Sequence, residues 1–381
     1  MIKKFLITLI TLPLAFNRRF RRRAINFLKD LSAANVLTFY RFVRRRPAKN
    51  SVLLIEANSC HGEVMAGYVK YFRTLGFDVD CLVHRDLKRE KMFCRLDTDG
   101  VTVFASTLAI FPWMLKTKYL NRYKHVLVMS SNVYAKSEYI MNLYPELKSH
   151  PSLFMVEHEL SDIPKYGGEN FIRDNRLIVL GKLNTGIFVN PHLFGDVKIT
   201  GKNDVPTFIT VGAIRAFRKN HAELIDAIKS LAATGKKFRV IVVGNGKLND
   251  LPREIKPFME ITGRLNFPDM FEKLESADFF LPLLDPDNPD HERYITTGVT
   301  GSTQLIYAFG KVPVLHKKFA KFYRFDDGNA IVYDDCLESA MLRAIDMTAD
   351  EYECAQENLT QAARDIEMES LDNLRQILNH A

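Results

Sequence analysis

The sequence lacks three features that would place it in a familiar class at once: a membrane-spanning apolar run, a set of paired cysteines and a metal-binding motif. The uncharged apolar run at residues 5–16 is interrupted by Pro13, and it falls short of the roughly 20 residues that a spanning helix needs. The 5 cysteines are odd in number and scattered, with no pair at metal-ligand spacing. These absences exclude a disulfide-stapled scaffold and a zinc module, and they favour a reducing, cytoplasmic compartment.

Excess positive charge is lacking outside the first 50 residues. Of the 53 Lys and Arg residues, 13 lie in residues 1–50 beside a single acid, Asp30, and the remaining 40 are outnumbered by 44 Asp and Glu. A nucleic-acid-binding protein would more usually spread Arg and Lys over a folded face. Because no nucleic-acid motif is present either, we expect no nucleic acid among the partners.

Residues 1–50 are predicted to form a basic amphipathic segment that associates with a membrane. Five arginines follow the apolar run, and further apolar residues are interleaved with Arg and Lys. This mixture suits helices that lie in the membrane interface with arginines on anionic head groups. We expect residues 1–46 to contact an anionic membrane surface and the protein to be peripheral on the cytoplasmic face of the plasma (inner) membrane. A basic tail, or a helix packed on the domain that follows, is the alternative.

Strand and helix patterns alternate along the rest of the chain, and the alternation starts twice. Residues 52–57 are predicted to form a buried strand, an amphipathic helix follows, and residues 79–83 are predicted to form the next strand. The pattern restarts with a strand at residues 207–211 and includes another at residues 279–283. We therefore predict an α/β fold of two Rossmann-like, doubly wound domains that face a cleft. The predicted boundaries are 1–50 for the basic segment, 51–195 for the first domain, 196–355 for the second and 356–381 for a C-terminal helix.

The segment at residues 296–305 carries two glycines and several hydroxyl side chains ahead of an apolar helix face. A helix N-terminus offers free backbone N–H groups and the positive end of a dipole, which together form a phosphate site. Glycine lets the backbone approach such an anion closely. Taken alone, an ordinary helix cap explains the same residues.

Four elements of the second domain resemble, in order and spacing, the nucleotide-sugar-binding domain of two-domain (GT-B) glycosyltransferases of the family 4 or group 1 type, which act on cell-surface polysaccharide or lipopolysaccharide. They are residues 211–215 with 218–220, residues 242–246, residues 261–265, and the Thr-Gly-Ser-Thr helix start with residues 310–314. The resemblance implies transfer of a sugar from a nucleotide diphosphate sugar to a lipid-linked or lipopolysaccharide/capsule-type glycan acceptor.

The expected donor site should stabilise the negative charge that develops on the diphosphate during the reaction. When the sugar–phosphate bond breaks, charge grows on the leaving diphosphate, and cations and oriented N–H groups lower the barrier. Arg215 and Lys219 lie four residues apart and together with the helix start would form a metal-free clamp. No cofactor is expected besides the donor, which is a co-substrate, and no metal is required. The predicted diphosphate ligands are Arg215, Lys219, Gly301, Ser302 and Thr303, and the nucleoside contacts that the resemblance implies are Gly244, Asn245, Thr262, Gly263, Arg264 and Gln304.

Candidate catalytic residues come from loops that follow predicted strands. Glu63 or His61 is placed to take the proton of an acceptor hydroxyl, because general-base chemistry needs a carboxylate or imidazole within hydrogen-bond reach. His158 resembles a sugar-contacting histidine of related enzymes, and Glu292 lies in an acidic stretch before the second-domain helix. Helix capping by Glu63 and a solvated acidic loop are the alternatives.

One departure from the resemblance leaves the stereochemistry of transfer open. Many retaining members carry two glutamates seven residues apart, whereas this chain has Gln304 or Leu305 near the second position. The same departure supports one alternative function, a catalytically degenerate, membrane-bound scaffold. A nucleotide-sugar epimerase of the same fold is the other alternative.

Overall fold

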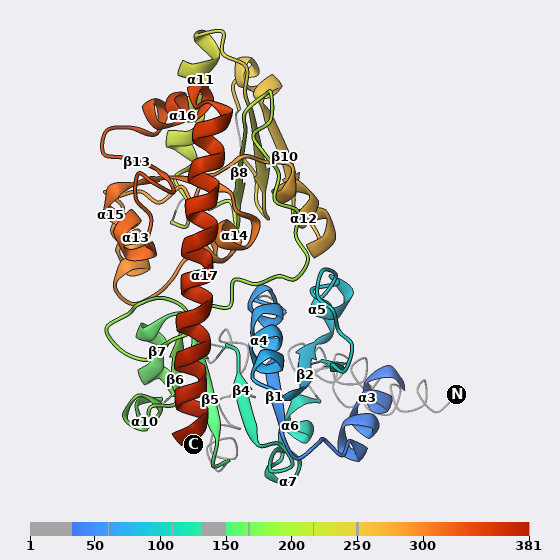
Figure 1. The fold of residues 1–381 in the computed structure, drawn as a ribbon. Coiled ribbons are helices and arrows are strands. Elements are labelled where there is room, and N and C mark those ends of the chain that lie inside the picture. The colour runs from blue at the N-terminus through green and yellow to red at the C-terminus, as the bar shows by residue number, and fades with distance from the viewer. Residues whose placement is uncertain are drawn as a thin grey trace, which may run out of the picture.

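The computed structural model describes residues 33–59, 61–107, 110–130, 150–166, 168–215, 217–248 and 251–380. Of the predicted basic segment, residues 1–32 lie outside this range, so its membrane role stays a prediction. The described chain folds into two parallel β-sheets, each flanked by helices, that follow one another along the sequence (Figure 1). Within the described residues, no helix combines the length and the apolar character that crossing a membrane requires.

The first sheet has seven parallel strands in the order β3-β2-β1-β4-β5-β6-β7. Its strands are β1 (Ser51–Glu56), β2 (Asp78–His84), β3 (Thr102–Ser106), β4 (His125–Val128), β5 (Leu153–Glu157), β6 (Leu177–Val179) and β7 (Ile187–Phe188). The helices around it are α3 (Ala33–Arg44), α4 (Glu63–Thr74), α5 (Arg85–Arg89), α6 (Phe111–Met114), α7 (Thr117–Leu120), the 3-10 helix η1 (Leu160–Tyr166) and α10 (Glu169–Arg173). Every residue of β1 is buried, as expected for a strand covered by helices on both faces.

The second sheet has six parallel strands in the order β10-β9-β8-β11-β12-β13. Its strands are β8 (Thr207–Val211), β9 (Arg239–Val243), β10 (Met259–Gly263), β11 (Phe279–Phe280), β12 (Val312–His316) and β13 (Ile331–Tyr333). The helices are α11 (His221–Ala233), η2 (Arg253–Phe258), α12 (Phe267–Glu275), α13 (Pro289–Glu292), η3 (Arg293–Ile295), α14 (Ser302–Phe309), α15 (Lys317–Ala320), η4 (Lys321–Tyr323), α16 (Leu337–Asp346) and α17 (Ala349–His380).

Both sheets have the 3-2-1-4-5-6 strand order of a Rossmann fold, and the first sheet adds β7 at its edge. The order reverses between β1 and β4 in the first sheet and between β8 and β11 in the second. Ligands of such folds bind beyond the carboxyl ends of the strands at this reversal. The predicted pair of Rossmann-like domains is confirmed, and the topology directs attention to the loops after these four strands.

The long helix α17 runs beside both sheets (Figure 1). Near its start, Tyr352 donates to Asp278 O at 3.0 Å in the second domain. Near its end, Asn373 donates to Phe188 O at 2.9 Å in β7, and Ser370 accepts the N–H of Asn190 at 3.0 Å. The C-terminal helix predicted at 356–381 therefore begins earlier in the structure, at Ala349, and it ties the second domain back to the first.

Backbone contacts also join the two domains directly. The N–H of Leu160 donates to Thr297 O at 2.7 Å, and the N–H of Val299 donates to His158 O at 3.3 Å. A Cβ on Gly298 would lie 3.2 Å from His158 O and 2.7 Å from a carboxylate oxygen of Glu159, so the two segments approach each other closely. These contacts bring the loop after β5 against the segment that leads into α14.

Candidate functional site

The carboxyl ends of β1 and β4 are tied together by the buried side chain of Glu56. Ser130 donates to Glu56 Oε2 at 2.7 Å, and the N–H of Asn58 donates to Oε1 at 2.8 Å. Burial raises the pKa of Glu56 to about 8, and the nearby His61 only partly opposes this. Glu56 is therefore mostly neutral at pH 7, and it holds in place the loop that carries His61.

His61, Glu63 and His158 come together beyond the strands of the first sheet. His61 Nδ1 lies 3.5 Å from Glu63 Oε1, and the rings of His61 and His158 are 4.8 Å apart. His61 has a positive φ of 66°, a left-handed conformation that is uncommon outside glycine and concentrates at functional sites. Three predicted catalytic residues thus form one cluster.

The cluster has a defined pattern of charge. Burial opposes the ionised form of Glu63, but the hydrogen bond and charge of His61 outweigh it, so the pKa of Glu63 is lowered. Burial lowers the pKa of His158 to about 4, which leaves its imidazole neutral at pH 7. His158 Nε2 lies 3.0 Å from Met129 O, so the proton of the neutral ring is on Nε2. An ionised carboxylate thus stands beside a neutral imidazole.

Lys219 is the central cation of the second domain. Its ammonium donates to Pro282 O at 2.8 Å, beyond β11, and to Ser302 Oγ at 3.4 Å, in the first turn of α14. The residue is only 6% exposed, and no carboxylate of the described residues pairs with it. Burial accordingly lowers the pKa of Lys219 to about 7. A lone buried ammonium is costly, so the structure places here a group that an anionic ligand would satisfy.

The N-terminus of α14 is organised by hydroxyl groups. Thr300 Oγ1 accepts the N–H of Ser302 at 3.3 Å, and Thr303 Oγ1 donates to Thr300 O at 2.8 Å. The N–H of Thr300 in turn donates to the hydroxyl of Tyr323 at 3.1 Å. The predicted ligands Gly301, Ser302 and Thr303 therefore start a helix whose entry loop is held in a fixed shape.

The cluster of His61, Glu63 and His158 meets the start of α14 at Gly301. A Cβ placed on Gly301, the N-cap of α14, would lie 3.9 Å from Glu63 Oε1, which belongs to the first residue of α4. The starts of two helices from different domains therefore face one another. Glu63 stands on one side of this contact, and Ser302 with Lys219 stands on the other.

Three glycines allow the loops after β8 and β9 to cross. A Cβ on Gly244 would lie 1.7 Å from Gly212 O, and a Cβ on Gly246 would lie 2.7 Å from Ile214. The N–H of Ile214 donates to Asn245 O at 2.9 Å. The predicted nucleoside residues Gly244 and Asn245 thus brace the loop that leads to Lys219.

Substitution of Gly244 by alanine is expected to lower the free energy of unfolding by about 3 kcal/mol, because the added methyl group meets backbone that cannot turn away. Urea unfolding followed by circular dichroism measures this. Gly201→Ala is the matched control, since a Cβ there meets nothing within 4 Å. Equal stability of the two variants would show that the crossing of the loops is not tight.

The other predicted nucleoside residues have protein partners of their own. Thr262 Oγ1 lies 3.0 Å from Gly263 O, and Arg264 forms a 2.5 Å ion pair with Glu90 of the first domain. Gln304 is buried, and with its amide nitrogen turned toward the loop it donates to Thr300 O and Gly301 O, both at 3.2 Å. Their roles in nucleoside binding remain predictions.

The side chains of two predicted site residues, Arg215 and Glu292, form no hydrogen bond or ion pair with the His61–Glu63–His158 cluster or with Lys219 within the described residues. Arg215 is exposed and lies over the ring of Phe217, with 6.0 Å from guanidinium carbon to centroid. Glu292 forms a 2.7 Å ion pair with Lys318, which satisfies its charge at the surface. Sequence analysis also missed Glu56, whose signal is a carboxylate at the end of an otherwise apolar strand.

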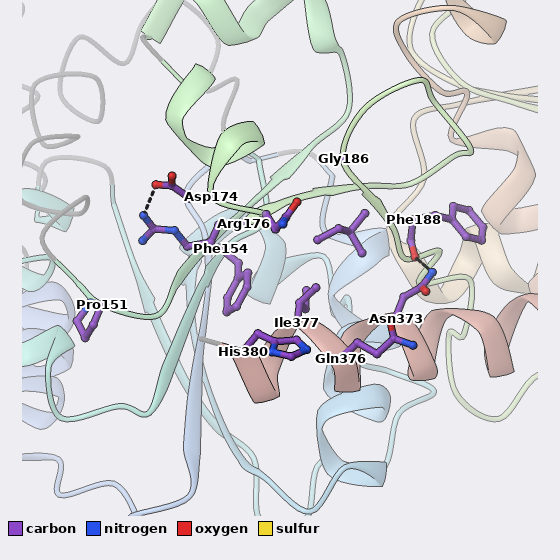
Figure 2. A pocket seen from close by; sticks show the side chains of 12 residues that line it. Pro151, Phe154, Asp174, Arg176, Gly186, Phe188, Asn373, Gln376, Ile377 and His380 are labelled. Atoms are coloured by element: carbon purple, nitrogen blue, oxygen red, sulfur yellow. Dashed lines mark hydrogen bonds and ion pairs between the residues drawn. The ribbon is translucent and has the colours of Figure 1, made fainter.

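A cavity of about 720 Å³ lies elsewhere, between the C-terminal part of α17 and the strands β5 to β7 (Figure 2). Its lining includes Phe154, Arg176 and Gly186, which stand at the amino ends of these strands. Arg176 is paired with Asp174 at 2.8 Å. Because doubly wound sheets bind ligands at the opposite, carboxyl ends, this cavity is not the candidate donor site.

Comparison with known proteins identifies the fold. The sequence matches no family model and no curated protein. Among solved structures, AviGT4, a glycosyltransferase involved in avilamycin A biosynthesis, is similar with a TM-score of 0.52 and 14% identity, over 87% of this chain and 98% of its own. WaaG, a glycosyltransferase involved in lipopolysaccharide biosynthesis, aligns over 84% of this chain and 98% of its own with a TM-score of 0.44 and 11% identity. The likeness to AviGT4 confirms the predicted GT-B fold.

Proposed function

We propose that this protein is a glycosyltransferase that moves a sugar from a nucleoside diphosphate sugar to a lipid-linked or lipopolysaccharide/capsule-type glycan acceptor. The observation that carries the proposal is the meeting of two helix starts from two domains. One presents the carboxylate of Glu63, and the other presents Ser302 with the buried ammonium of Lys219. A base and an anion site lie next to one another, as sugar transfer from a diphosphate requires.

The proposed reaction assigns a task to each side of this contact. An acceptor hydroxyl gives its proton to Glu63, and its oxygen forms a bond to the anomeric carbon of the donor sugar. The bond from that carbon to the diphosphate breaks, and its electron pair stays on the diphosphate oxygen. Lys219 and the N–H groups at the start of α14 stabilise the charge that develops there. Because these groups do the work of a metal ion, we propose that none is required.

The acceptor and the location follow from the basic segment at residues 1–46. Its composition suits an anionic membrane surface, and glycan acceptors with a lipid anchor are presented at such a surface. We propose that the protein works as a peripheral protein on the cytoplasmic face of the plasma (inner) membrane.

Nucleoside diphosphates are expected to bind in the presence of EDTA. Titration of the full chain with UDP, GDP, ADP and dTDP, followed by calorimetry and thermal unfolding, should show saturable binding of at least one. At 100 times the dissociation constant, the bound form should be about 2.7 kcal/mol more stable to unfolding. Binding that appears only with added divalent cations would contradict the metal-free site, and the absence of any binding would favour the degenerate scaffold.

Product analysis separates transfer from epimerisation. A transferase should convert the donor to nucleoside diphosphate and a glycosylated acceptor when membranes are supplied. An epimerase that hydrolyses the donor should release free sugar without any acceptor and should not need residues 1–46. Full activity of a chain without these residues on soluble substrate would therefore favour the epimerase.

A further inference from the structure

A surface groove of about 460 Å³ lies on the first domain, at the edge of the sheet formed by β3. It is bounded by α3, by the segment that follows α5, and by the start of β3. The lining residues are Arg41, Lys88, Lys91, Met92, Phe93, Cys94, Thr98, Val101 and Val103. The opposite edge strand, β7, contacts α17, and α3 lies on the flank of the first domain away from that helix (Figure 1).

The rim of the groove carries three positively charged side chains. Arg41, Lys88 and Lys91 are exposed, and no carboxylate of the described residues pairs with any of them. Lys91 has a φ of 56° because it ends α5 in a Schellman motif, in which its N–H donates to Lys88 O and the N–H of Met92 donates to Leu87 O.

Three acidic residues on the same stretch of chain pair with other cations, whereas the exposed Asp99 has no ion pair within the described residues. Asp86 pairs with Arg89 at 3.2 Å, Glu90 with Arg264 at 2.5 Å, and Asp97 with Arg73 at 3.4 Å (the Glu90 pair crosses to the second domain). Arg41, Lys88 and Lys91 therefore form no ion pair within the described residues, and together they attract an anion to the groove.

The floor of the groove is apolar. Met92 is buried, and Phe93, Val101 and Val103 are half-buried and pack on the core of the first domain. A free phosphate ion gains nothing from such a floor, whereas a molecule with a phosphate head and a hydrocarbon chain uses both the floor and the rim.

The outer face of α3 continues this surface. Val36, Leu37 and Tyr40 are 50%, 59% and 47% exposed, and their spacing places them on one side of the helix. Arg44 lies 4.3 Å from the centroid of Tyr40, and Arg41 belongs both to α3 and to the groove. Exposed apolar and aromatic side chains beside arginines are typical of helices that rest in a membrane interface.

We propose that the groove binds an anionic phospholipid of the bilayer, with the phosphate head group on Arg41, Lys88 and Lys91 and the first part of an acyl chain over Met92, Phe93, Val101 and Val103. The exposed face of α3 enters the interface beside it. This site extends the proposed membrane attachment from the basic N-terminal segment, to which α3 and Arg41 belong, to Lys88, Lys91 and the floor of the groove, and it does not depend on donor binding.

Cys94 provides a local readout on the full chain. It lines the groove and is exposed, as are Cys336 and Cys354 of the second domain. Alkylation of each cysteine, followed peptide by peptide by mass spectrometry, should be slowed several-fold at Cys94 by monomeric dihexanoyl phosphatidylglycerol. The rates at Cys336 and Cys354 should not change. Dihexanoyl phosphatidylcholine and inorganic phosphate should protect Cys94 weakly or not at all.

The paired variant Lys88→Ala/Lys91→Ala should lose this protection and bind the anionic lipid about 20-fold more weakly, since each cation near an anionic lipid surface contributes about fivefold. Lys237→Ala/Lys256→Ala, which removes two exposed lysines of the second domain, is the matched control and should behave like the parent chain. Both variants should bind nucleoside diphosphates as the parent chain does, which separates this site from the donor site.

Three results would overturn the inference. Equal protection by the zwitterionic lipid would remove the role of the rim cations, and protection by inorganic phosphate alone would indicate a free-anion site. Retained protection in Lys88→Ala/Lys91→Ala would place the lipid elsewhere. If nucleoside diphosphates do not bind but Cys94 is still protected, the proposed function fails and the lipid site stands.

Discussion

Replacement of Lys219 by methionine is expected to weaken nucleoside diphosphate binding by about 100-fold without destabilising the folded chain, because a charge-assisted contact to a phosphate contributes roughly 1.5–3 kcal/mol. The two effects separate because the ammonium is buried, donates to Pro282 O and Ser302 Oγ, and has no carboxylate partner within the described residues. Methionine has a similar length and no charge to desolvate. In the absence of ligand, the variant should therefore be as stable as the parent or more stable.

The ionisation of Lys219 should also make the stability of the folded chain depend on pH, which is a second way to measure the cost of burying its charge. Burial lowers its pKa to about 7, from 10.5 in the unfolded chain. Between these values the unfolded state binds more protons than the folded state, so this group makes stability rise with pH across the window. Below pH 7 both states carry the charge, and the full cost of burying it remains. The free energy of unfolding of the Lys219→Met variant should not show this rise with pH.

The affinity for a nucleoside diphosphate should change with pH in the direction opposite to the stability. The ligand favours the charged ammonium, so affinity should fall as the pH rises above 7, and binding near pH 8 should take up a proton. Calorimetry in buffers of different ionisation enthalpy measures that uptake. Lys229→Met, at an exposed lysine paired with Asp226 at 3.3 Å, is the control and should change neither quantity. Unchanged affinity in Lys219→Met would remove the anion site from this position.

The two-domain architecture could be predicted because its signals are local. Buried parallel strands appear as short apolar runs with glycine or polar residues at their ends, and the run pattern starts twice. The predicted strand at residues 279–283 was too long: only Phe279–Phe280 pair in the sheet. Pro282 cannot donate to a ladder, and Leu283 has a φ of 55°. The chain turns there and presents Pro282 O to Lys219.

The environment of the site residues could not be predicted, because it depends on contacts far apart in the sequence. Lys219 was identified from its place in an ordered set of motifs, but its burial comes from Pro282 and Ser302, 63 and 83 residues away. The ion pair of Arg264 with Glu90 joins residues 174 positions apart and crosses between the domains. A sequence pattern reports which residues share an element, and it does not report which loops of two domains meet.

Replacement of Glu63 by glutamine is expected to lower the turnover of sugar transfer by roughly 10²–10⁴-fold, the range that a positioned general base contributes. Glutamine has nearly the same shape, so α4 should still form and diphosphate affinity should stay close to that of the parent chain. A loss confined to turnover is the result that distinguishes a base from a residue that merely caps the helix, since loss of a cap appears in stability.

The residues near Glu63 determine how the turnover of sugar transfer should depend on pH. The hydrogen bond and charge of His61 lower the pKa of Glu63, so its carboxylate is ionised across neutral pH, and turnover should fall only under acidic conditions. Glu56→Gln, by contrast, should shift this acidic limb, because it changes the carboxyl group that holds the His61 loop. Initial rates measured across pH with saturating donor separate the two variants.

Two carboxylates, Glu63 and Glu292, are candidates for the base, and a comparison of their glutamine variants decides between them. The ion pair of Glu292 with Lys318 leaves it no contact with the His61–Glu63–His158 cluster within the described residues, so Glu292→Gln should change turnover by less than about threefold, as expected for a surface substitution. Glu272→Gln, at an exposed position of α12, serves as the control. A greater loss in Glu292→Gln than in Glu63→Gln would reverse the assignment. The base would then belong to the second domain, and the contact between the starts of α4 and α14 would serve only to position the donor.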